Sequence, residues 1–250
     1  MNEIMIGLLI GTVAQLSEMI IGLGYGAISS SALLAFGFSP IIVTASVHTA
    51  EAVTLGATTL RYYRAKLLEK GLIRRLVIPG IIGTIIGFLV VLFIPTNILK
   101  PYICLYLVYL GVSFVVRKTN APSDSVEPRS NQLASIALVG GFFDTVGGGG
   151  WGPIVTGNLL RLGYQAKRAI VASVCSKWII SFQSALLFSI VTISQSINII
   201  IGLTISGVAL SYFAPRLSGL IKNHGLLIKF VGLFVIIVNL YTLNKLLHFN

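Results

Sequence analysis

Gly22-Leu-Gly-Tyr-Gly26 and Gly148-Gly-Gly-Trp-Gly152 are two glycine-rich turns that lie inside otherwise apolar sequence. The two stretches align without a gap at an offset of 126 residues, which pairs Tyr25 with Trp151. Membrane proteins whose helices break at corresponding points of two halves commonly bind their ligand at those breaks. The duplication therefore predicts two repeats, each with one broken helix.

The composition indicates a membrane protein. Of 250 residues, 55% are hydrophobic and only 10% are charged, and the mean hydropathy is +0.93. Charge this sparse cannot cover a soluble domain, and apolar runs of about 18 or more residues are typical of membrane-spanning helices. Such runs recur along the whole chain, beginning with residues 4–21. We therefore expect an all-α polytopic protein in a lipid bilayer.

Ten apolar segments are predicted, and two of them, the second and the seventh, are too short to cross about 30 Å of hydrocarbon. Both short segments directly follow the glycine turns. The expected fold therefore has about eight full transmembrane helices and two short broken-helix segments. The ten segments are 4–21, 24–36, 40–60, 76–94, 98–116, 132–147, 152–162, 167–190, 197–214 and 226–246.

A polar, proline-containing stretch divides the chain. We expect an N-terminal transmembrane repeat over residues 1–116, a cytoplasmic linker over 117–131, and a C-terminal transmembrane repeat over 132–250. Clusters of Pro, Ser and Asn between apolar segments are typical of loops. The two glycine turns fall in different repeats, as a duplication requires.

The basic residues predict the topology. The net charge is +11, and nearly all Lys and Arg lie in short loops, which fits positive-inside topology and excludes nucleic-acid binding as their purpose. If the short segments count as passes, every strongly basic loop lies on one side of the membrane. If the short segments instead enter the membrane and return to the same side, the loops at 161–168 and 215–225 lie on the opposite side of the membrane from the loop at 61–75. The first count places five passes in each half, so the second repeat is inverted, as in alternating-access transporters.

The glycine turns are the expected anion site. Free amides at a broken helix need partners in lipid unless the break lines a cavity, and the amides and dipole at a helix N-terminus attract anions. The alternative is that the glycines only permit close helix packing. The residues expected to bind the anion are Gly22, Gly24, Tyr25, Gly26, Gly148, Gly149, Gly150, Trp151, Gly152 and Lys177.

Charged residues inside apolar segments are the candidates for proton coupling. An unpaired charge at membrane depth costs several kcal/mol, so such residues pair, face water or become neutral. Glu18 and Asp144 occupy equivalent positions, four residues before each turn. They either carry protons or cap the free amides of the other half's turn.

His48 and Glu51 share one helix face at a spacing of three residues. In the other half the corresponding helix carries Lys177 within a stripe of serines, so each half has a polar helix face. Lys177 either attracts the anion or pairs with Glu51 or Asp144. His48 either relays protons or is a satisfied hydrogen-bonding residue.

Two stretches resemble the sulfite exporter TauE/SafE family of membrane permeases: Gly140-Gly-Phe-Phe-Asp-Thr-Val-Gly-Gly-Gly-Gly-Trp-Gly-Pro153 and Ala45-Ser-Val-His-Thr-Ala-Glu51. The resemblance implies a bacterial inner-membrane permease. It also implies a small sulfur-containing anion, such as sulfite or an organosulfonate, as cargo and protons as the coupling ion. One departure is that the counterpart of Ala50-Glu51 is Lys177-Trp178, which lacks an acid.

Other classes of function fit less well. The sequence contains no Ser/His/Asp set, metal-ligand spacing or cofactor motif, so we expect no enzyme, no metal and no cofactor. A passive anion channel or uniporter is the main alternative, followed by a structural or accessory membrane protein. The oligomeric state is left open by the sequence, because lipid-facing and protein-facing apolar surfaces look alike.

Overall fold

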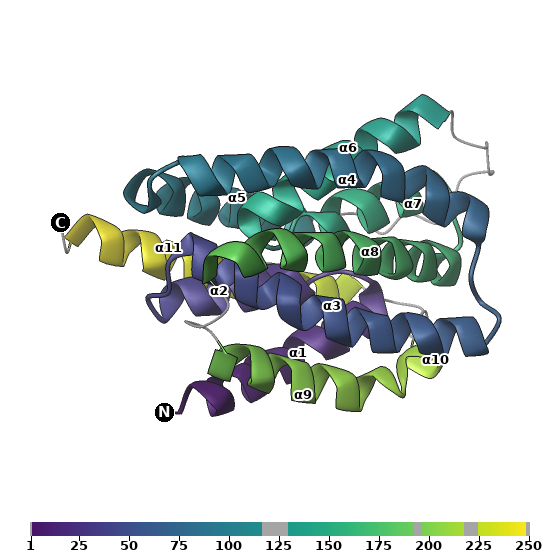
Figure 1. Cartoon of the computed structure of the whole chain (residues 1–250), viewed down its shortest axis with the longest axis horizontal. Coiled ribbons are helices and arrows are strands. Elements are labelled where there is room, and N and C mark those ends of the chain that lie inside the picture. Colours follow the sequence, from purple (N-terminus) through teal and green to yellow (C-terminus); the bar gives the residue numbers. More distant parts are fainter. Residues whose placement is uncertain (1, 117–129, 193–196, 218–224, 249–250) are drawn as a thin grey trace.

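The computed structural model describes residues 2–116, 130–192, 197–217 and 225–248, which are helical apart from short turns (Figure 1). No strand occurs in these ranges. The elements are α1 (Glu3–Ile21), α2 (Tyr25–Ala35), α3 (Pro40–Arg64), α4 (Lys70–Phe93), α5 (Thr96–Val116), α6 (Ser130–Gly147), η1 (Gly152–Thr156), α7 (Gly157–Arg161), α8 (Ala166–Thr192), α9 (Ile197–Ser211), α10 (Ala214–Leu217) and α11 (Gly225–His248).

Six helices of the described chain are long and apolar enough to span a membrane: α1, α3, α4, α5, α8 and α11. The sequence predicted about eight. The two others expected, α6 and α9, do not meet this criterion. α6 begins with the polar run Ser130-Asn-Gln132, and α9 has only 15 described residues. The chain is thus an all-helical, multi-pass membrane protein.

Both glycine turns break the chain through left-handed backbone. Gly22 has φ +69° and Gly148 has φ +67°, a conformation that glycine adopts without the steric cost of a Cβ atom. The Gly22 amide donates to the Glu18 carbonyl, which ends α1. In the second half the π-helical turn η1 follows, with Pro153 at one of its first positions. Short helices therefore follow both turns, as expected.

The helices of the two halves pack on each other. α1 lies along α9, α6 lies along α4, and α3 meets α8 in the middle of the bundle. Gly7 and Gly202 let α1 approach α9, because a Cβ on Gly7 would lie 3.0 Å from the Cα of Gly202. The two expected repeats are therefore interleaved rather than two separate bodies.

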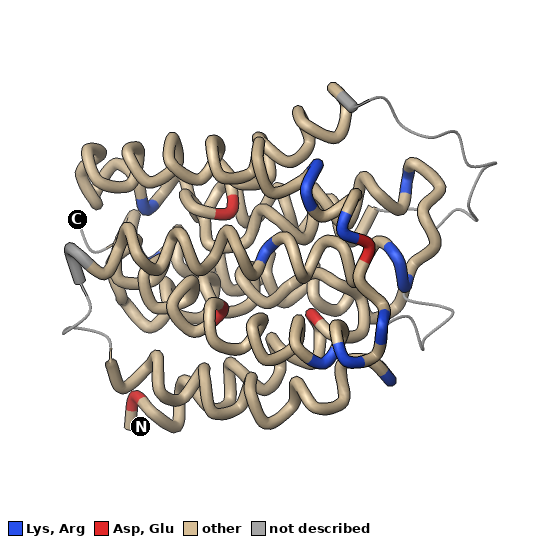
Figure 2. The backbone as a smooth tube through the Cα atoms, turned by 45° about the vertical axis from the view of Figure 1, so that its right-hand side comes forward, with Lys and Arg blue, Asp and Glu red and all other residues tan. Residues whose placement is uncertain are grey.

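Basic residues gather at one end of the bundle. Figure 2 shows Lys and Arg concentrated at the right-hand end, where α3 leads into α4 and α7 leads into α8. Lys100 is an exception, since its Nζ donates to the Phe38 carbonyl (3.3 Å) in the connection between α2 and α3. The end of α5 and the start of α6 also lie at the basic end (Figure 1). The linker between them, residues 117–129, lies outside the described residues.

One ion pair joins the starts of α4 and α8 at this basic end. The Arg168 guanidinium donates through two nitrogens to the Glu69 carboxylate, and it holds the pKa of that carboxyl below its usual range. The pair contributes stability at neutral pH, and that contribution is lost as the pH falls through the depressed pKa. Because both side chains are partly exposed, the pair contributes only about 0–1 kcal/mol.

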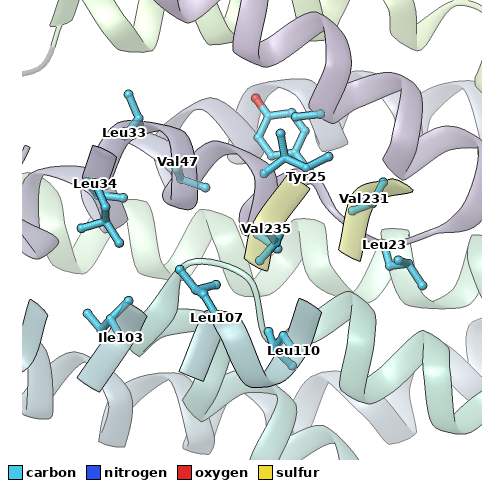
Figure 3. Close-up of a cluster of buried hydrophobic side chains, with 14 of the residues drawn as sticks. Leu23, Tyr25, Leu33, Leu34, Val47, Ile103, Leu107, Leu110, Val231 and Val235 are labelled. Carbon is cyan, nitrogen blue, oxygen red and sulfur yellow. The ribbon is translucent and has the colours of Figure 1, made fainter. Parts of the chain in front are cut away.

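Each short helix is anchored by an aromatic side chain. Tyr25 at the start of α2 belongs to an apolar cluster that includes Val47, Leu107 and Val235 (Figure 3). Trp151 at the start of η1 belongs to a second cluster built from α4, α6 and α8. Both side chains are fully buried. In this conformation the two aromatic residues fill the seams beside the short helices.

The glycine packing gives a first prediction. A Cβ on Gly149 would lie 2.5 Å from the backbone nitrogen of Ala27. We therefore expect Gly149→Ala to lower the free energy of unfolding by about 1–3 kcal/mol through overpacking, measured by denaturation in detergent micelles. Gly71→Ala in α4 is the matched control, because no atom lies within 4 Å of its Cβ position. Equal stability of the two variants would contradict tight packing of the turns.

Candidate functional site

A buried ionic cluster lies at the meeting point of the two halves. The Nζ of Lys177 on α8 lies 2.5 Å from Glu51 Oε1 on α3 and 3.9 Å from Asp144 Oδ1 on α6. The three residues are at most 1% exposed. Both pairings proposed for Lys177 from the sequence are therefore present, and the lysine links helices from both halves of the chain.

Further contacts hold the remaining oxygen of Glu51. The Ser181 hydroxyl donates to Glu51 Oε2 (2.8 Å), and His48 Nδ1 lies 3.3 Å from the same oxygen. His48 Nε2 lies 3.2 Å from the backbone carbonyl oxygen of Asp144. A carbonyl oxygen only accepts, so Nε2 carries a hydrogen. His48 thus connects α3 to the end of α6.

Each acid before a glycine turn binds the helix that follows it. The Tyr25 amide donates to Glu18 Oε2 (3.1 Å), and the Trp151 amide donates to Asp144 Oδ1 (2.9 Å). The sequence offered capping of the other half's turn as one alternative. The structure instead has each acid on its own turn, because the chain folds back over the helix end four residues after the acid.

The two glycine turns touch one another. Gly26 packs against the carbonyl of Gly148, Gly149 packs against Ala27, and a Cβ on Gly152 would lie 2.7 Å from the Cα of Leu23. The predicted anion-binding glycines are therefore brought together at the centre of the molecule. Backbone of one turn fills the space beside the other turn, so the centre is closed in this conformation.

Two hydroxyls at equivalent positions reach across to the opposite turn. Thr156 Oγ1 donates to the Gly22 carbonyl (2.7 Å) and lies 2.7 Å from Ser173 Oγ. Its counterpart at the same 126-residue offset, Ser30, lies against Gly148, and the Ser30 hydroxyl has no hydrogen-bond partner within the described chain. This pair was not among the residues predicted from the sequence. The internal offset was the signal that could have identified it.

A metal ion is a poor fit to the cluster. His48, Glu51 and Asp144 could each offer one ligand atom, and these atoms lie within 4.8 Å of one another. However, the Lys177 ammonium lies against both carboxylates, and His48 Nε2 is used by the Asp144 carbonyl. A fixed positive charge among the ligands repels a second cation. The ammonium therefore occupies the position that a metal would need.

The fold and this cluster define the class: a helical multi-pass membrane protein with paired charges enclosed between two interleaved halves. The chain belongs to the sulfite exporter TauE/SafE family, whose sequence profile matches residues 7–242. It is 32% identical over 259 residues to the probable membrane transporter protein YtnM of Bacillus subtilis (strain 168), covering 97% of this chain and 83% of that protein. No solved structure matches the chain.

Family membership confirms the resemblance that the glycine run and the Ala45–Glu51 segment indicated. It assigns the chain to a family of membrane transporters, and this class supports transport rather than catalysis.

The ion pair gives a second prediction. Glu51→Leu leaves the Lys177 ammonium without its closest partner, so we expect the free energy of unfolding to fall by about 3–5 kcal/mol. The double variant Glu51→Leu/Lys177→Met should recover most of that loss, because neither charge is then buried. Denaturation in detergent of both variants and of Lys177→Met alone measures the coupling. Effects that simply add would contradict a direct ion pair.

Proposed function

We propose that this chain is a secondary transporter that moves a small sulfur-containing anion, such as sulfite or an organosulfonate, across the cytoplasmic membrane. The family name supports sulfite or a similar anion as cargo, and the description of the Bacillus subtilis relative supports a membrane transporter. The observation that carries the proposal is Lys177, a lysine buried between carboxylates from both halves. Charged residues enclosed in membrane proteins are rare, and they typically mark ion or substrate pathways.

The donors at the cluster suit an oxyanion. Carboxylate oxygens of Glu51 and Asp144 accept from the Lys177 ammonium and from the Trp151 amide. A sulfonate or sulfite presents oxygens of similar charge at similar spacing and can replace a carboxylate at such donors. Cargo binding then means that the anion displaces a carboxylate from Lys177. The predicted glycine site contributes amides once the turns separate.

We infer inverted repeats over residues 1–116 and 132–250. In support, α1 starts at the opposite end of the bundle from α6 (Figure 1). The contacts of α1 with α9 match those of α6 with α4. The basic end then faces the cytoplasm by the positive-inside rule, together with the linker at 117–131.

Alternating access follows from two repeats that differ in conformation and exchange their roles. Thr156 holds the Gly22 carbonyl, whereas its counterpart Ser30 makes no hydrogen bond within the described chain. In the opposite conformation Ser30 takes the bond and Thr156 releases it. The contact between the two glycine turns opens first toward one side of the membrane and then toward the other side.

Transport into proteoliposomes tests the function. We expect labelled sulfite, thiosulfate or methanesulfonate to accumulate under an imposed pH gradient, and a protonophore to abolish the accumulation. Equilibration without accumulation would instead identify a passive channel or uniporter. No flux of any of the three anions would overturn the proposed cargo class.

Lys177→Met tests the site. Losing one partner of a buried charged contact typically costs about 2–5 kcal/mol, so the affinity for the transported anion should fall by at least about 30-fold. Lys245→Met is the matched control, because it removes one lysine from an exposed position near the end of α11. An unchanged half-saturation concentration in Lys177→Met would remove this residue from the site.

A further inference from the structure

The cluster contains more acidic than basic groups. The groups that face one another there are Glu18 from α1, His48 and Glu51 from α3, Asp144 from α6 and Lys177 from α8, with the hydroxyls of Tyr25 on α2 and Tyr106 on α5 nearby. All of the carboxyl groups are buried. Three carboxyl groups therefore share one ammonium group in a medium where net charge is costly.

Two of the acids must hold protons while no cargo is bound. Lys177 and Glu51 form the close ion pair and neutralise each other. Glu18 and Asp144 each have one oxygen on a backbone amide, and their other oxygens, Glu18 Oε1 and Asp144 Oδ2, have no hydrogen-bond partner within the described chain. Each of these two oxygens therefore carries one proton while no cargo is bound. The cargo-free cluster is then neutral.

Cargo binding disturbs this neutrality at Glu51. An anion that takes the Lys177 ammonium leaves the Glu51 carboxylate buried without a counterion, which is strongly unfavourable. A proton on Glu51 restores neutrality. Glu51, rather than Glu18 or Asp144, is then the acid whose protonation changes with each transport cycle.

His48 offers a second proton position beside the first. Its Nε2 hydrogen is committed to the Asp144 carbonyl, so Nδ1 of the neutral ring carries a lone pair toward Glu51 Oε2 at 3.3 Å. A protonated Glu51 can donate to Nδ1, and a further proton makes the ring cationic.

We infer, on the basis of the proposed function, that transport is electroneutral and that each negative charge on the cargo is accompanied by one proton. Glu51 takes the first proton and His48 takes the second. A monovalent sulfonate therefore moves with one proton and a divalent anion such as thiosulfate with two. The cluster has no third position of this kind among the described residues, so a trivalent anion is excluded.

Proton counting in proteoliposomes tests this inference. Methanesulfonate and thiosulfate keep fixed charges of one and two near neutral pH, so the two anions give independent counts. Isotope uptake and proton uptake are measured together while valinomycin and potassium clamp the membrane potential. We expect one proton per methanesulfonate and two per thiosulfate, with neither rate changed by an inside-negative potential. The same proton count for both anions, or uptake slowed by that potential, would overturn the inference.

His48→Gln separates the two proton positions. The glutamine amide can still donate to the Asp144 carbonyl, but it offers no basic nitrogen toward Glu51. We expect the count for thiosulfate to fall from two to one and its uptake to become sensitive to the potential, while the count for methanesulfonate stays at one whatever the rate. An unchanged count of two for thiosulfate would overturn the role of His48.

Glu51→Gln provides a second variant that removes the first position. Any remaining methanesulfonate flux should carry no proton and should respond to the membrane potential. Retention of one proton per methanesulfonate would assign the coupling proton to Glu18 or Asp144 instead and overturn the inference. Failure of the wild-type protein to move methanesulfonate, thiosulfate or sulfite above the level of empty liposomes would overturn the proposed function itself, which distinguishes the two failures.

Discussion

The ammonium group of Lys177 is the constraint on which the rest of the structure depends. A lysine so deeply enclosed needs an anionic partner, which it finds in Glu51 on α3, and its ammonium also lies 3.9 Å from Asp144 on α6. Because those helices come from both halves, satisfying one charge also ties the halves together. The Lys177 ammonium thus stabilises the closed arrangement, and in the proposed function a cargo anion competes with the Glu51 carboxylate for it.

The glycine turns make this arrangement sterically possible. Left-handed backbone at Gly22 and Gly148 reverses the chain so that Glu18 and Asp144 reach the first amides of the helices that follow. Because glycine has no Cβ atom, the backbone of one half packs directly on the backbone of the other half at these turns. From the sequence, the glycines of the turns were expected either to permit close packing or to bind a ligand. The structure shows the closely packed turns, and in the proposed transport cycle the same turns separate to bind the anion.

Much of the fold could be predicted from the sequence, because apolar runs and glycine breaks are local signals. The 126-residue offset paired Glu18 with Asp144, and pairing with Glu51 or Asp144 was one of the two roles predicted for Lys177. Helix partners were not predictable, because apolar faces that meet protein resemble those that meet lipid. The acid-to-turn contacts also depend on chain reversal, and the contact of His48 with the Asp144 carbonyl depends on packing of α3 against α6.

The most direct test is a structure determined with bromomethanesulfonate, whose bromine can be located by anomalous scattering. A sulfonate oxygen within hydrogen-bonding distance of Lys177 Nζ, with the Glu51 carboxyl group moved away, is the predicted result. Bromine at a different place, together with an intact contact between Lys177 and Glu51, would contradict the central claim that cargo displaces the buried carboxylate.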